Sequence, residues 1–400
     1  MPALAQRLNN FQVAASVAMT TKARELSAQG HAVISLTIGE PDFATPRHAV
    51  NAAYEAGLAG QTKYPPMDGT KSLKEAIQRK FLRDNNLHYA LNEIMVANGG
   101  KQVITNAFFA TCDPGDEVLI PSPFWISYAQ QAKLAEATPR FIECSQNNGF
   151  RLRPEELEAA ITPRTKWLIL NFPNNPTGAA CSREEMQALA GVLLRHPQVW
   201  IMSDDMYEHL VYDDFEFCTI AEVEPRLRDR VLTLNGASKT YAMTGWRIGY
   251  AGGPAALIRA MSNIQGQLTG GVSTVGQAAA AAALDGPQDL IQERAKAYRE
   301  RRDLALSILA DAPGMHCHKP EGAFYLYPNV AGCLGRVSGG GRLIQTDADL
   351  AMAILEEKYV GTVAGSAYGV SPYLRLSYAT DAVALSEACG RIVDFCKDLR

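Results

Sequence analysis

The stretch from Asn235 to Gly252 constrains this chain most, because it places a lysine between two segments that are typical of interior strands. Residues 231–234 and 248–251 are short apolar runs of the kind that form buried strands. Lys239 should therefore project from a tight turn between two interior elements. A buried ammonium group is costly, and the cost disappears if the amine is neutral or is consumed in an imine. We therefore predict that Lys239 is a nucleophile toward an aldehyde.

Arg247 follows eight residues after this lysine. Its guanidinium fork suits a phosphate group better than a lysine would, so one short segment could carry both a covalent link and an anion clamp. Pyridoxal phosphate is the aldehyde that fits both features. The alternative is a structural surface turn, because small residues and a lysine are common between strands.

Length and composition favour a two-domain globular protein. The chain has 400 residues, of which 47% are hydrophobic, and this length exceeds what one core usually serves. A net charge of -4 argues against nucleic acid or an anionic membrane as the main partner. Because we find neither a signal-peptide apolar region nor a run of transmembrane length, we place the protein in the cytoplasm.

The eight cysteines are scattered without the Cys-x-x-Cys spacing of zinc or redox sites. Free thiols in a reducing compartment are therefore expected. The cluster His316-Cys317-His318 is the one metal-like sequence, and its neighbours supply no third and fourth ligand. We predict no metal site.

Two predicted strands end in residues that could hold a phosphorylated ring. The apolar run 94–97 leads into Gly99-Gly100-Lys101 and then a helix from Val103 to Cys112, so backbone amides at the helix start could bind an anion. The run 200–203 ends at Asp204, and parallel α/β sheets present their chemistry at such carboxyl ends. We expect the next residue, Asp205, to be solvated. An ordinary glycine turn is the alternative for the first junction.

Three further loops carry unusual residues. Gly39, after a strand predicted over residues 32–36, allows a close backbone approach. Trp125 ends a loop in which polar turn residues would be expected, although it could simply belong to the core. The loop 171–178 fixes two consecutive asparagines between prolines.

These segments together resemble a known family. The pattern Gly236-x-Ser238-Lys239 followed by Gly245-x-Arg247-Ile248-Gly249, the Asn-Pro-Thr-Gly sequence at 175–178 and the Arg-Leu-Ser-Tyr-Ala sequence at 375–379 occur in the family's order. They resemble the class I pyridoxal-phosphate aminotransferases, the aspartate aminotransferase family. The resemblance runs from about residue 7 to residue 399 and is strongest to a bacterial subgroup with a Gly-Gly-Lys turn.

The resemblance implies the α/β architecture called pyridoxal-phosphate fold type I. The large domain, residues 46–285, should contain a mostly parallel, seven-stranded sheet flanked by helices. A smaller, discontinuous α+β domain should combine residues 1–45 and 286–400. Two departures concern the site walls: residues 269–272 lack the proline of a Ser-Asn-Pro-like turn, and Ala364 stands where the family has proline.

The resemblance also implies the roles of individual residues. Lys239 is the catalytic residue, and Asp204 should pair with the nitrogen of the cofactor ring. The resemblance assigns cofactor binding to Gly99, Gly100, Lys101, Trp125, Asn175, Asp204, Tyr207, Ser238, Lys239, Arg247 and, from the partner subunit of a homodimer, Tyr64. It assigns substrate binding to Gly39, Arg375, Trp125, Asn175, Lys101 and Ser16.

The implied activity is ping-pong transfer of an amino group from aspartate or glutamate to a 2-oxo acid such as 2-oxoglutarate. Arg375 should bind the α-carboxylate, and Lys101 should bind the far one with help from Ser16. Gln12 stands where some relatives that accept prephenate have a lysine, so prephenate is expected to be a poorer substrate.

Three alternatives remain open at this point. One is a transaminase that prefers aromatic amino acids, and another is a pyridoxal-phosphate-dependent lyase on the same fold. A non-enzymatic regulator would need an added DNA-binding segment, and this chain begins almost at the catalytic domain.

Overall fold

The structure is a computed structural model that describes residues 15–400. In the first helix it describes the side chains of Met19 and of residues 21–28. Gln12 therefore lies outside the described residues, as does the side chain of Ser16.

The large lobe is built on a seven-stranded sheet within the described residues, with strand order β2-β8-β7-β6-β5-β3-β4. The strands are β2 (Ile94–Asn98), β3 (Glu117–Ser122), β4 (Thr138–Glu143), β5 (Thr165–Asn171), β6 (Trp200–Asp204), β7 (Val231–Gly236) and β8 (Ile248–Gly252). All neighbours pair in parallel except those of β8, which is antiparallel to both β2 and β7. The predicted mostly parallel sheet is confirmed.

Helices cover both faces of this sheet, because its strands alternate their apolar side chains between two cores. One core includes Leu168 and Leu170 of β5 and the other Trp167 and Ile169. The helices that contribute to the first core are α3 (Lys71–Asn85), α6 (Pro154–Ala160), α7 (Arg183–Leu193), α8 (Ile220–Val223), α10 (Thr274–Asp285) and α2 (Arg47–Leu58), the last of which packs on α10. Those that contribute to the second are α4 (Gly100–Thr111), α5 (Ser127–Leu134) and α9 (Ala255–Leu268).

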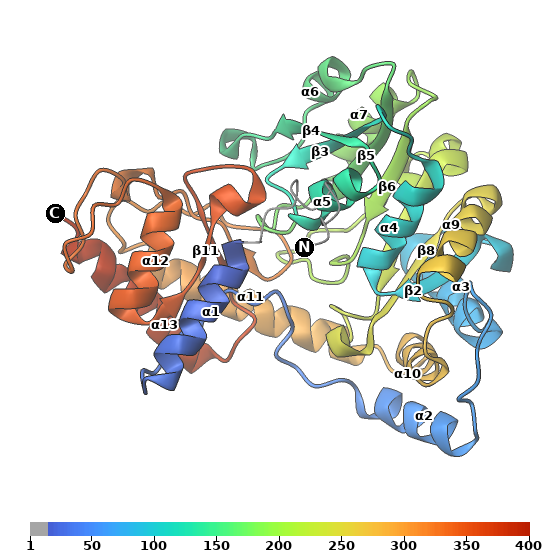
Figure 1. Ribbon diagram of the computed structural model, residues 1–400, viewed down its shortest axis with the longest axis horizontal. Helices are drawn as coiled ribbons and strands as arrows, with labels where there is room; N and C mark the ends of the chain where they lie inside the picture. The colour runs from blue at the N-terminus through green and yellow to red at the C-terminus, as the bar shows by residue number, and fades with distance from the viewer. Residues whose placement is uncertain (1–14) are drawn as a thin grey trace, which may run out of the picture.

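The small lobe combines both parts of the chain that flank the large one. Its strands form the pair β1 (Ile34–Ser35) with β10 (Val360–Gly361), and the sheet β11 (Val363–Ala364), β12 (Leu374–Ser377) and β9 (Tyr325–Leu326). Its helices are α1 (Ala15–Ala28), α12 (Asp347–Lys358), α13 (Ala382–Asp398) and the long α11 (Asp289–Leu309), which reaches across from the large lobe (Figure 1). These elements share a third core.

The α/β fold class expected from the sequence is therefore present in the large lobe, and the small lobe combines helices with short strands, three of which form an antiparallel sheet. The cores agree with a discontinuous small lobe, while the division at residues 46 and 286 stays a prediction.

Three predicted elements differ from those observed, and the first is the strand predicted over residues 32–36, which is limited to β1 at Ile34–Ser35. The strand predicted over residues 322–326 is reduced to Tyr325–Leu326, because the backbone of Gly322 bonds to Gly178 and that of Ala323 to Leu210. The helix predicted from Val103 begins at Gly100, so Lys101 lies in its first turn. Strand β4 was not predicted, since as an edge strand it exposes most of its side chains.

Candidate active site

A cavity of about 410 Å³ lies where the carboxyl ends of the large sheet face the small lobe. Its wall contains most of the predicted site residues, namely Gly39, Gly100, Lys101, Trp125, Asn175, Asp204, Tyr207, Ser238, Lys239, Arg247 and Arg375. The wall therefore brings together residues as far apart in the sequence as Thr37 and Arg375.

Lys239 lies in the turn that follows β7, as its sequence position predicted. Its Nζ donates a hydrogen bond to the carbonyl oxygen of Gly39. Burial lowers the pKa of Lys239 to about 8, and the guanidinium groups of Arg375 and Arg247 act in the same direction. Glu40 and, more weakly, Asp204 oppose this shift in pKa. A substantial fraction of this amine is therefore neutral near physiological pH.

Asp204 ends β6 and is buried. The hydroxyl of Tyr128 donates to its Oδ2 at 2.5 Å, and the backbone N–H of Met206 donates to its Oδ1 at 3.4 Å. Burial nevertheless raises the pKa of Asp204 to about 6. Because no ion pair joins it to a basic side chain in the described part of the chain, this carboxylate suits a cationic N–H group of a ligand.

The junction between β2 and α4 brings positively charged side chains to the start of a helix. Gly99 has a φ of +82°, and a Cβ there would lie 2.3 Å from Nη2 of Arg247. Burial and the neighbouring Arg247 both lower the pKa of Lys101. Two cations thus converge beside the amides at the start of a helix, and the ion pairs within residues 21–400 include neither of them. This arrangement fits a phosphate or a carboxylate.

Arg375 approaches the cavity from β12 in the small lobe. Its Nη1 donates to Oδ1 of Asn175 at 3.1 Å, and its Nη2 donates to the carbonyl oxygen of Thr37 at 2.5 Å. Its Nε is buried and has no hydrogen-bond partner among the described atoms. A buried guanidinium with a spare donor is suited to a carboxylate ligand.

Comparison with known proteins agrees with this geometry. The family model described as aminotransferase class I and II matches residues 31–392. The chain belongs to this family. An aspartate/prephenate aminotransferase of Cereibacter sphaeroides is 53% identical over 399 residues, which span 100% of both chains.

Solved structures agree as well. The crystal structure of the aspartate aminotransferase from Rhizobium meliloti matches with a TM-score of 0.98 at 49% identity and covers 100% of both chains. The aspartate aminotransferase of Thermus thermophilus with maleate matches with a TM-score of 0.91 at 38% identity, covering 99% of this chain and 100% of that one. The predicted family and its fold type I architecture are thereby confirmed, while the Gly-Gly-Lys subgroup stays a prediction.

Three predicted residues of this aminotransferase do not line the cavity, and one of them, Gly99, lies just behind the wall against Arg247. Tyr64 is 98% exposed, and Ser16 belongs to α1 with a side chain outside the described part. The prediction that Tyr64 serves a partner subunit is therefore untested. Residues that the sequence did not single out also line the wall, among them Tyr128 and Tyr368. No sequence signal marks Tyr128, because its contact with Asp204 joins segments that lie far apart in the sequence.

The prediction that Asp205 is solvated is wrong. This side chain is 3% exposed, and Ser203 Oγ donates to its Oδ1 at 2.7 Å. The backbone N–H of Asp205 donates a hydrogen bond to the carbonyl oxygen of Leu234, so strand β7 lies against this residue. Burial raises the pKa of Asp205 to about 7, although the hydroxyl groups of Ser203 and Thr219 act in the opposite direction.

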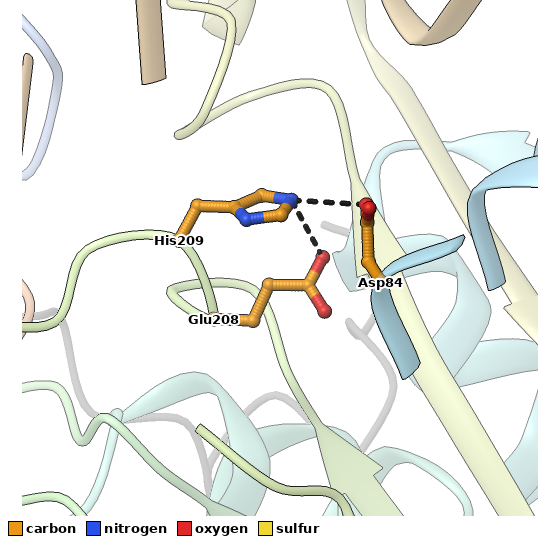
Figure 2. A group of neighbouring side chains, drawn as sticks. All are labelled: Asp84, Glu208 and His209. Carbon is orange, nitrogen blue, oxygen red and sulfur yellow. Dashed lines mark ion pairs between the residues drawn. The ribbon is translucent and has the colours of Figure 1, made fainter. Parts of the chain in front are cut away.

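A second acidic group of the aminotransferase lies behind the cavity wall. Figure 2 shows Nε2 of His209 facing Asp84 and Glu208, at 3.3 Å from a carboxylate oxygen of each. The ammonium of Lys80 forms a buried ion pair with Glu208, and Asn235 donates to the same carboxylate at 2.8 Å. Since Lys80 already supplies the positive charge, we interpret this cluster as an ion-pair network that joins α3 to β7.

No helix in the described residues is long and apolar enough to cross a membrane.

Proposed function

We propose that this chain binds pyridoxal phosphate through Lys239 and transfers the amino group of aspartate or glutamate to a 2-oxo acid such as 2-oxoglutarate. The observation that carries the proposal is the lysine amine with a pKa lowered to about 8, in a cavity that also holds the buried carboxylate of Asp204. Two separate cationic groups, Arg375 and Lys101, complete this wall.

The residues present fit this cofactor. The corner formed by Gly100 and Arg247 offers positive charge and helix amides to the phosphate, and the tight approach of Gly99 to Arg247 leaves no room for a side chain there. Asp204 offers a buried carboxylate to the ring nitrogen. When bound, pyridoxal phosphate supplies an aldehyde that combines with amines and a ring that accepts the electron pair from the substrate Cα.

The chain's own groups then perform three tasks. Lys239, once free, takes the proton from the substrate Cα, because its lowered pKa leaves far more of the amine neutral near pH 7 than a solvated lysine would have. Asp204 keeps a proton on the ring nitrogen of the cofactor. Arg375 binds the α-carboxylate and thereby fixes the position of Cα.

Charge supports a dicarboxylic substrate. A second carboxylate needs a second cation, and Lys101 lies on the same wall with its Nζ 5.3 Å from the ring centre of Trp125. A Thermus thermophilus relative has been solved with maleate, which is a dicarboxylate. A Cereibacter sphaeroides relative is named for prephenate as well as aspartate, so prephenate is the second candidate to test.

The amide of Asn175 and the hydroxyl of Tyr207 should bind the phenolic oxygen of the cofactor. Because Oδ1 of Asn175 accepts from Arg375, its amide N–H groups are left to donate. Trp125 should stack on the ring, and Ser238 and Gly39 complete the walls for cofactor and substrate.

We further propose a homodimer in which Tyr64 reaches the site of the other subunit. Val50, Tyr54 and Leu58 recur every four residues on α2, so they form one stripe, and Tyr54 and Leu58 are 64% and 66% exposed. Both this exposed apolar stripe and the nearly fully exposed Tyr64 are suited to burial by a second copy. The spacing of the cysteines supports a reducing compartment, the cytoplasm.

A half-reaction tests the function. The protein loaded with pyridoxal phosphate is mixed with aspartate in the absence of an acceptor. We expect one equivalent of the 2-oxo acid for each site and no ammonia, with continued turnover once 2-oxoglutarate is added. Release of ammonia would instead establish a lyase.

A further inference from the structure

Tyr325 lies directly behind the wall of the cavity without forming part of it. Its side chain is fully buried on the short strand β9. In the antiparallel register Tyr325 pairs with Ser377 of β12, so it shares a sheet face with Arg375, two residues before Ser377. Leu326 and Leu376, which pair next to them, belong to the core of the small lobe.

The ring of Tyr325 supports the guanidinium of Arg375. The Cζ atom of Arg375 lies 4.6 Å from the ring centre of Tyr325 and 5.0 Å from that of Tyr368. Both distances are within the range of a cation–π interaction, which is strongest where water is excluded. The position of this guanidinium is therefore set by aromatic faces as well as by its hydrogen bonds.

The hydroxyl of Tyr325 reaches a different part of the site. It lies 2.8 Å from the hydroxyl of Tyr207, which comes from the large lobe. A Cβ on Gly39 would lie 2.7 Å from the Tyr325 oxygen, so the absence of a side chain at Gly39 is what admits this hydroxyl.

The direction of this hydrogen bond matters, because each hydroxyl has one proton. Tyr207 can donate to a ligand oxygen in the cavity only if Tyr325 donates to Tyr207. Tyr325 can take the donor role, since its hydroxyl makes no other hydrogen bond in the described residues.

We propose that Tyr325 is a positioning residue that links the two halves of the site, its ring fixing Arg375 for the substrate carboxylate and its hydroxyl directing the proton of Tyr207 into the cavity. This proposal rests on the proposed function. The two roles belong to different atoms of one side chain, so two substitutions separate them.

The test compares Tyr325→Phe with Tyr325→Leu in the loaded enzyme. Tyr325→Phe keeps the ring, so the Kd of maleate, measured by calorimetry, should stay within about twofold of the wild-type value. It removes the hydroxyl, so kcat with aspartate and 2-oxoglutarate should fall by about three- to tenfold. Tyr325→Leu removes the ring face as well, so the maleate Kd should also rise by about three- to thirtyfold.

A spectroscopic readout and a matched control complete the design. In Tyr325→Phe, the pH midpoint of the bound cofactor's absorbance change should move upward, because a weaker donor stabilises an anionic oxygen less. Tyr378→Phe is the control, since it removes a buried hydroxyl that donates to Ala323 at 3.2 Å, away from the cavity wall. It should leave kcat, the maleate Kd and the pH midpoint unchanged.

The inference is overturned if Tyr325→Phe keeps the wild-type kcat, if Tyr325→Leu keeps the wild-type maleate Kd, or if Tyr378→Phe reproduces both losses. Failure of the wild-type protein to transaminate aspartate would instead refute the proposed function.

Discussion

At the scale of single residues, the site owes its chemistry to charges held away from water. The pKa of Lys239 is lowered and that of Asp204 is raised, so both shifts favour the neutral form. Burial is the largest cause of each shift in pKa. Each group would become a typical charged side chain at the surface, so the cavity rather than the residue type sets the reactivity.

The lowered pKa of Lys239 predicts how the protein without cofactor captures the aldehyde. Only the neutral amine attacks, so the rate of covalent capture should rise with pH and level off above a midpoint near pH 8, the value to which burial lowers this pKa from 10.5. Absorbance after rapid mixing with pyridoxal phosphate measures the rate. A midpoint near 10.5, as for a solvated lysine, would contradict the account.

Lys101 should decide between substrates. Lys101→Ala removes a charge-assisted contact to the far carboxylate, so kcat/KM for aspartate and glutamate should fall by about ten- to a hundredfold while that for phenylalanine is spared. Lys133→Ala, on the exposed side of α5, is the matched control and should change neither value. An equal loss for both kinds of substrate would place Lys101 on the cofactor instead.

At the scale of elements, the junction of β2 and α4 depends on a glycine. Gly99→Ala should weaken the binding of pyridoxal phosphate by about ten- to a hundredfold, because a Cβ would displace the guanidinium of Arg247. Gly115→Ala is the control, since it has a φ of +100° and no atom within 4 Å of a Cβ.

Both substitutions should lower the free energy of unfolding by about 1–3 kcal/mol, because alanine is strained at the positive φ of each position. Calorimetry and fluorescence titration separate the two effects. If both variants bound the cofactor equally well, the contact between Gly99 and Arg247 would have no role in binding.

The elements that the sequence predicted well are those with a continuous apolar run. Residues 200–203 indicated a buried strand ending at Asp204, and the observed β6 ends there. The edge strand β4 gave no such signal because most of its side chains face water. Residues 322–324 have the composition of a strand, but their backbone pairs with loops distant in sequence, and local patterns do not contain this information.

The site shows the same limit. Residues such as Lys239 and Arg375 were predicted because they occur in short motifs of one segment. The burial of Asp205 and the contact between Tyr207 and Tyr325 were not, because each depends on which segment folds over another. Ser16 and Tyr64 remain predictions from resemblance.

At the scale of the whole molecule, the cavity lies between two lobes, and the proposed dimer would supply Tyr64 from a second copy. Hybrid dimers test this. Lys239→Ala should be inactive, and Tyr64→Ala should bind the cofactor weakly. After random subunit exchange, about half of the dimers should contain one chain of each variant. In each such heterodimer, one site combines an intact Lys239 with the intact Tyr64 of the other chain. About a quarter of all sites should therefore recover native properties.

Activity of the exchanged mixture at low cofactor concentration provides the measurement, and sedimentation confirms that dimers form. No recovery in verified heterodimers would show that Tyr64 acts within its own subunit or not at all.

The central claim is that Lys239 forms the covalent link to pyridoxal phosphate, and reduction followed by peptide mass spectrometry tests it most directly. The loaded protein is treated with borohydride and digested, and the modified peptide is sequenced. We expect the reduced cofactor on Lys239 alone, with no stable modification and no steady-state transamination in Lys239→Ala. Attachment to another lysine, or multiple turnover by that variant, would contradict the account.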